Sequence, residues 1–78
     1  MELDWREYIE SNPKVLFGKP VIKETRISVD LILEKLSMGE SFDQLSKAYP
    51  HIPKEAFFAC LSFAAEVIKN EIVIPKAS

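Results

Sequence analysis

Residues 18–29 read GKPVIKETRISV, and this stretch decides how the rest of the chain is organised. The residue pairs at 21–22 and 26–27 flank a short polar turn, which is the pattern of two arms of a tight β-hairpin. Many such turns require a positive φ angle, and glycine adopts that angle more easily than the glutamate found at position 24. Glu24 therefore indicates either a different turn or local backbone strain.

A helix is predicted directly after this turn. Ser28 is a favoured N-cap residue, and the apolar residues that follow share one face at helical spacing: Val29, Ile32, Leu33 and Leu36. Asp30 in the first turn suits the positive end of the helix dipole. Gly39 lies just past the last turn, where glycine commonly ends a helix.

Two further helices are predicted in the second half of the chain. Ser41 and Gln44 form a capping-box pattern that starts a short helix, and Pro50 ends it. The longest helix spans residues 53–70 and is apolar on nearly every side. A chain of 78 residues has too little protein to cover such a helix, so we expect a homodimer. The predicted interface residues are Phe57, Phe58, Leu61, Phe63, Ala64 and Ile68.

The size and composition are those of one globular domain, with 47% hydrophobic and 28% charged residues. We expect a single domain over residues 1–78, with an N-terminal hairpin arm (1–27), a three-helix core (28–70) and a C-terminal tail (71–78). The tail either folds back on the hairpin, forms an edge strand of this domain or offers an edge to a partner strand. No run reaches the roughly 18 apolar residues of a membrane span and no signal peptide precedes the fold, so we expect a cytoplasmic protein.

Few residues have the chemistry of a catalytic site. His51 is the only histidine, and its place in a turn is typical of a surface residue. Cys60 is flanked by apolar residues in the long helix, which predicts a small buried side chain. One cysteine and one histidine cannot form a zinc cluster, and two glycines cannot form a phosphate-binding glycine loop. We therefore expect neither an enzyme nor a bound metal or cofactor. Trp5 is either a lid over the core or part of an interface.

The short helix, the turn and the longer helix have the outline of a helix-turn-helix. Among the first residues of the longer helix only Lys54 suits a DNA contact, because Glu55 repels phosphate. More positive charge lies in the turn at 23–26, together with Lys14 and Lys19, although the net charge of the chain is −2. Such a loop would contact phosphates with little sequence specificity. Two functions stay open, a DNA-binding protein and a protein-interaction module whose helices only pack in this outline.

Several short motifs occur in a characteristic order. They are GKPVIK at residues 18–23, TRI at 25–27, Gly-Glu-Ser at 39–41 and Tyr-Pro at 49–50. In this order, from about Ile9 to Glu66, the sequence resembles the prokaryotic family catalogued as domain of unknown function 433. It departs from the family pattern at four positions, where the family usually has Gly, Gly, Pro and a polar cap: Phe17, Glu24, Ser28 and Pro53.

This resemblance implies a mainly α protein, a small homeodomain-like or winged helix-turn-helix domain behind a short N-terminal β-hairpin. It also implies an antitoxin of the VapB type, which neutralises a PIN-like toxin nuclease by direct binding, with repression of its own operon through operator DNA as a further expectation. The candidate residues for contact with DNA or the partner are Lys19, Lys23, Thr25 and Arg26, to which the helix-turn-helix outline adds Lys54. The alternative is that the motif only forms the hairpin, in an interaction or dimerisation module without DNA binding.

Overall fold

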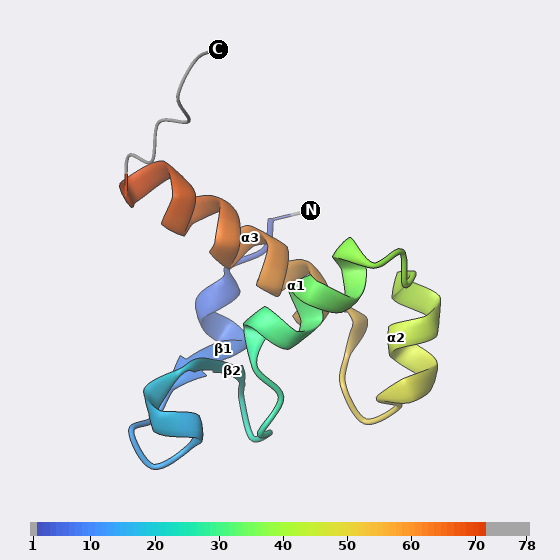
Figure 1. Cartoon of the computed structure of the whole chain (residues 1–78), viewed down its shortest axis with the longest axis horizontal. Helices are drawn as coiled ribbons and strands as arrows, with labels where there is room; N and C mark the ends of the chain where they lie inside the picture. Colours follow the sequence, from blue (N-terminus) through green and yellow to red (C-terminus); the bar gives the residue numbers. More distant parts are fainter. Residues whose placement is uncertain (1, 72–78) are drawn as a thin grey trace.

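The chain folds into a short β-hairpin followed by three α-helices, in a computed structural model that describes residues 2–71, with only the backbone of Glu71 (Figure 1). The elements, in chain order, are η1 (Trp5–Glu7), β1 (Ile9–Ser11), η2 (Leu16–Gly18), β2 (Pro20–Ile22), α1 (Val29–Ser37), α2 (Phe42–Ala48) and α3 (Lys54–Glu71). The predicted fold class, mainly α with three helices behind an N-terminal hairpin, is confirmed. The predicted tail lies outside the described residues, apart from the backbone of Glu71 at the end of α3.

The hairpin is formed by β1 and β2, which is not the pair of arms that the sequence predicted. The two strands are antiparallel, and Ile9 lies opposite Ile22. Both side chains are buried, so this register places them together on the core side of the sheet. The predicted arm at 26–27 forms no strand of its own, but it does meet the other edge of β2, where the N–H of Ile22 donates to the carbonyl of Ile27 at 2.9 Å beside an isolated bridge between Val21 and Ser28. The longer ladder is the one with β1, where Ile9 is the buried partner of Ile22.

The turn after β2 holds a residue other than glycine in the left-handed backbone conformation. Glu24 has a φ of +62°, the positive angle expected at this position, and a residue with a side chain adopts it at a steric cost. Thr25 closes the turn with its hydroxyl, which donates to the carbonyl of Ile22 at 2.7 Å and accepts from the N–H of Ile27 at 3.0 Å. The Thr25 side chain therefore holds the turn together.

The predicted ends of the first two helices are confirmed by their hydrogen bonds. The Ser28 hydroxyl accepts from the N–H of Leu31 at 3.3 Å, and Gly39 follows α1 with a φ of +96°. At the start of α2, the Ser41 hydroxyl accepts from the N–H of Gln44, whose side chain accepts in return from the N–H of Ser41. These caps satisfy N–H groups that have no partner inside the helix.

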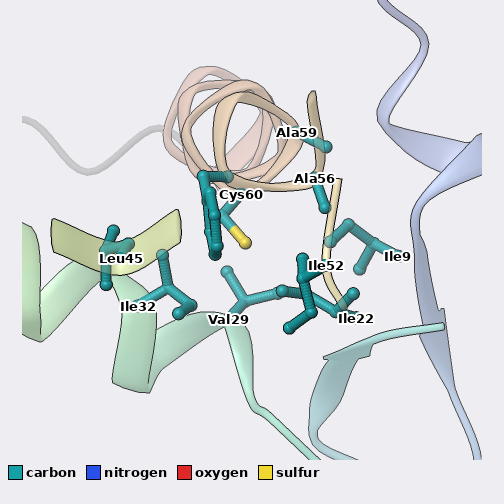
Figure 2. Close-up of a cluster of buried hydrophobic side chains, with 10 residues drawn as sticks. Ile9, Ile22, Val29, Ile32, Leu45, Ile52, Ala56, Ala59 and Cys60 are labelled. Atoms are coloured by element: carbon teal, nitrogen blue, oxygen red, sulfur yellow. The ribbon is translucent and has the colours of Figure 1, made fainter. Parts of the chain in front are cut away.

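The core lies where the first half of α3 contacts the hairpin, α1 and α2 (Figure 2). Its buried side chains are Ile9, Ile22, Val29, Ile32, Leu45, Ile52, Ala56, Phe57, Ala59 and Cys60. Figure 2 shows the sulfur of Cys60 facing this cluster, in agreement with its prediction as a buried side chain. Burial raises the pKa of the Cys60 thiol to about 12, so the thiol stays protonated at neutral pH.

The N-terminal segment is fastened to α3 by Trp5. Its indole Nε1–H donates to Glu66 Oε2 at 2.7 Å, and its ring meets the Phe63 ring edge to face with centroids 4.8 Å apart. The Arg6 guanidinium lies 4.5 Å from the centre of the Trp5 ring and 3.4 Å from Glu66 Oε2. Of the two predicted roles for Trp5, the structure shows the lid, because the ring packs against the core of its own chain. We call these four side chains the Trp5 clasp.

Candidate interaction surface

An open groove of about 360 Å³ lies where the second half of α3 passes the starts of β2 and α1. It is apolar except for one cation and one anion, and it is lined by Lys19, Pro20, Val29, Asp30, Leu33, Phe63, Ala64, Val67 and Ile68. We call it the apolar groove. Hydrophobic concave surfaces with a few charged groups at the edge are the usual form of a binding site.

The two charges of the groove pair with each other. Lys19 Nζ lies 3.4 Å from Asp30 Oδ2, and both side chains are largely exposed, so the ion pair adds little to stability. The hydrogen bond from the Ser28 side chain, helped by Lys19, lowers the pKa of the Asp30 carboxyl. Asp30 therefore stays ionised at neutral pH and gives this edge of the groove a fixed negative charge.

The predicted dimer interface is divided between the core and the surface. Phe57 is fully buried in its own chain and has no surface left for a second copy, so its assignment to an interface is corrected to the core. Phe58 stacks on Phe42 of α2, with ring centroids 4.5 Å apart. Ala64 and Ile68 line the apolar groove with Phe63, and Leu61 lies outside it. Ile68 is 65% exposed and Leu61 40%, which leaves uncovered apolar surface along the second half of α3.

The predicted cations do not form one surface. Lys23 and Arg26 are exposed on the turn after β2, and neither forms an ion pair with the side chains that the structure describes. Lys19 lies at the groove in its pair with Asp30, and the Thr25 hydroxyl is used inside the turn. Lys54 begins α3, where its Nζ lies 3.7 Å from Asp43 of α2. The structure thus brings together Lys23, Thr25 and Arg26 and leaves Lys54 on a different element.

A protruding aromatic residue was not identified from the sequence. Phe17 in η2 is 102% exposed, and positive φ angles occur at Leu16 (+48°), Phe17 (+57°) and Gly18 (+82°) in succession. This left-handed turn directs the Phe17 side chain into the solvent instead of toward the rest of the protein. The signal in the sequence was Gly18 with Pro20 directly after an apolar run, because the two residues prevent that run from continuing as a strand.

Other ligand chemistry is sparse in the described part of the chain. Among residues 2–71 no three potential metal-ligating side chains come together. His51 is exposed in the turn before α3, as predicted, and Cys60 lies in the core. None of the described helices is long and apolar enough to cross a membrane.

A β-hairpin and three helices define a small helical domain, and an open apolar groove lies on its surface. The chain belongs to the family described as "Protein of unknown function (DUF433)", whose model matches residues 9–64, and this confirms the family resemblance. Comparison with curated proteins and with solved structures gives no match. The family match ends at Ala64, so Val67 and Ile68 of the groove lie beyond it.

Proposed function

We propose that this chain is a protein-interaction module of the antitoxin type, which binds protein partners through the apolar groove. The observation that supports this most strongly is the groove itself, about 360 Å³ with a largely apolar lining. Ile68 at its side leaves most of its side chain in water. Contiguous exposed apolar surface of this kind commonly marks a protein-binding site.

The family resemblance supplies the class of partner in this proposal. The bound protein is a PIN-like toxin nuclease, which the module neutralises by direct contact, and the module itself is a homodimer in the cytoplasm. The exposed cations Lys23 and Arg26 add to the proposal, because a nuclease that binds metal ions carries acidic groups at its active site. The turn that holds these two cations is closed by Thr25, so they are presented on a fixed backbone.

The experiment co-expresses the chain with the protein encoded by the adjacent gene and measures co-purification and RNA cleavage. We expect the wild-type chain to co-purify with that protein and to suppress cleavage. Ala64→Arg places a charge in the groove and should abolish both effects. Ala65→Arg is the matched control, because Ala65 is an exposed neighbour on α3 outside the groove lining. Equal effects of the two substitutions, or no binding by the wild type, would contradict the proposal.

Repression of the operon is a second candidate function, favoured by Lys23 and Arg26. The start of α3 does not favour reading of bases, since Lys54 is drawn toward Asp43 and Glu55 is exposed beside it. DNA contact would therefore be made to phosphates by the turn, and binding should weaken steeply with salt, by a slope of about 0.9 per contact. Replacing Lys23 and Arg26 by alanine should lower that slope in a mobility-shift titration with the promoter fragment. The absence of any shift at low salt would exclude this second function.

A further inference from the structure

We propose that the apolar groove receives Phe17 from a second copy of this chain. Two copies then pair about a two-fold axis, with each Phe17 in the groove of the other. This inference rests on the proposed function, because it takes the groove to be a protein-binding site and names its occupant in the free dimer, which the neighbouring protein then displaces when it binds there.

The first argument is the state of Phe17. Its ring is fully exposed and its backbone is held in the left-handed region, so neither packing nor backbone preference within the single chain explains its conformation. The turn is nevertheless fixed, because the N–H of Gly18 donates to the carbonyl of Val15 at 3.0 Å and that of Lys19 to Leu16 at 3.2 Å. A large aromatic side chain on a rigid turn loses little freedom when it binds. Phe17 is therefore prepared for insertion into an apolar site.

The second argument is the fit of the groove. A closed cavity of about 150 Å³ holds a benzene molecule, so a groove of about 360 Å³ has room for a phenyl ring and part of a neighbouring side chain. Phe63 in the groove wall provides an aromatic partner, and aromatic pairs gain from offset or edge-to-face contact. The size and the chemistry of the groove both match Phe17.

The third argument is the arrangement of these features along the chain. Phe17 is followed closely by Lys19 and Pro20, which belong to the groove lining, so the protruding ring is attached to the chain two residues from the edge of the groove. A two-fold axis makes the contact of ring and groove twice, once in each direction, and this symmetry closes the assembly as a dimer instead of an open filament.

The main test compares Phe17→Gly with the wild-type full-length chain by light scattering and sedimentation at micromolar concentrations. Glycine favours the positive φ of this position, so the variant should fold at least as stably as the wild type. We expect the wild type to be a dimer and Phe17→Gly to raise its dissociation constant about tenfold or more. Met38→Ala is the matched control, because Met38 is 76% exposed and lies outside the groove lining. A monomeric wild type, or a Phe17→Gly chain that dimerises as well as the wild type, would overturn the inference.

A cross-linking experiment tests the contact itself. One copy carries Phe17→Cys and a differently tagged copy carries Ile68→Cys, and the mixture is oxidised and separated on a non-reducing gel. We expect a disulfide-linked pair that contains both tags, formed faster than in a mixture of Met38→Cys and Ile68→Cys. Cys60 is buried and gives only a low background. Equal rates in the two mixtures would place Phe17 away from the groove.

Two further variants separate this inference from the function on which it rests. If replacing Ile72 and Ile74 by serine abolishes pairing and Phe17→Gly does not, pairing depends on these residues instead of on Phe17 and the inference is overturned. If Phe17→Gly leaves self-association unchanged while Ala64→Arg abolishes capture of the neighbouring protein, the groove binds that protein and only the inference fails. If Ala64→Arg changes neither self-association nor capture of the neighbouring protein, both the inference and the proposed function fail.

Discussion

The two halves of α3 have similar apolar sequences and opposite environments. In the first half, Ala56, Phe57, Ala59 and Cys60 are all fully buried against the hairpin, α1 and α2. In the second half, residues 61–68 are covered on one side by the Trp5 clasp and otherwise border the groove or the solvent. The comparison shows that an apolar helix in a small chain is buried only where other elements reach it. The apolar surface that no other element reaches stays exposed to solvent.

Because burial differs between the two halves of α3, the hydrophobic free energy that each half contributes to folding differs too. Full burial of a large apolar side chain stabilises a protein by about 1.5–3 kcal/mol. Phe57 contributes such an amount to the folding of the single chain because it is fully buried. Ile68 contributes only a small part of it, because most of its side chain is exposed to solvent. The first half of α3 thus stabilises the domain, and the second half leaves apolar surface exposed, which the proposed function assigns to a partner.

The largest expected effect tests the contrast directly. Phe57→Ala should lower the free energy of unfolding by about 3–5 kcal/mol, because it leaves a cavity in the core. Leu61→Ala, one helical turn later, should change it by only about 0.5 kcal/mol, as at most surface sites. Urea denaturation at one fixed protein concentration measures both, since a dimer makes stability depend on concentration. Equal losses would show that the second half is buried as deeply as the first.

A smaller effect is expected at the clasp that holds the second half. Trp5→Phe keeps an aromatic ring against Phe63 but removes the N–H that donates to Glu66. We expect a loss of about 1 kcal/mol, below the roughly 1.5–3 kcal/mol of a buried hydrogen bond to a charged group, because the Glu66 side chain is 39% exposed. Hydrogen exchange should accelerate in residues 61–68 more than in residues 54–60. Glu66→Gln is the control, because its amide oxygen still accepts from Trp5 while the charge near Arg6 is lost. A uniform change along α3 would contradict the separate roles of the two halves.

The wall of the groove opposite α3 depends on the cap of α1. Ser28→Ala removes the hydroxyl that accepts from the N–H of Leu31, which should cost about 1 kcal/mol of stability. The loss should loosen the first turn of α1, where Val29 and Asp30 line the groove. Ser37→Ala is the comparison, because its hydroxyl bonds a carbonyl of the last turn and does not cap the helix. Thermal unfolding of both variants measures the difference, and equal shifts would argue against a role of the cap.

The smallest expected effect is a pH dependence at the edge of the groove. The hydrogen bond from Ser28, followed by Lys19, lowers the pKa of Asp30 in the folded chain. The unfolded chain therefore takes up this proton first as the pH falls, so the contribution of Asp30 to stability is present above its unfolded pKa, near pH 4, and is lost below it. Asp30→Asn should lower stability slightly at neutral pH and approach the wild type at acidic pH. Unfolding curves between neutral and acidic pH measure this difference, and a gap that stays constant with pH would exclude it.

Features set by neighbouring residues could be predicted from the sequence. The caps at Ser28 and at Ser41 with Gln44 involve residues three positions apart, and the positive φ at Glu24 follows from the needs of one turn. Contacts between distant residues could not be predicted in this way. The pairing of Ile9 with Ile22 depends on the long connection between them, and the bond from Trp5 to Glu66 joins opposite ends of the chain.

The apolar groove shows the same limit of prediction from sequence. Ile68 and Ala64 were expected at an interface because α3 is apolar all round, and both line the groove. The same pattern placed Phe57 with them, since periodicity cannot show which side of an apolar helix the rest of the chain will cover. The exposed position of Phe17 depends on a left-handed turn. Gly18 and Pro20 indicate that the apolar run ends, but the run itself does not indicate that Leu16 and Phe17 take part in that turn.

The single cysteine of this chain gives it a built-in probe of its own motions. Cys60 lies in the packed half of α3, so a thiol reagent reaches it only when that part of the domain opens. The labelling rate therefore reports how often opening occurs, with no added dye or engineered site. A partner that holds only the second half of α3 should leave this rate unchanged, whereas one that stabilises the whole domain should slow it.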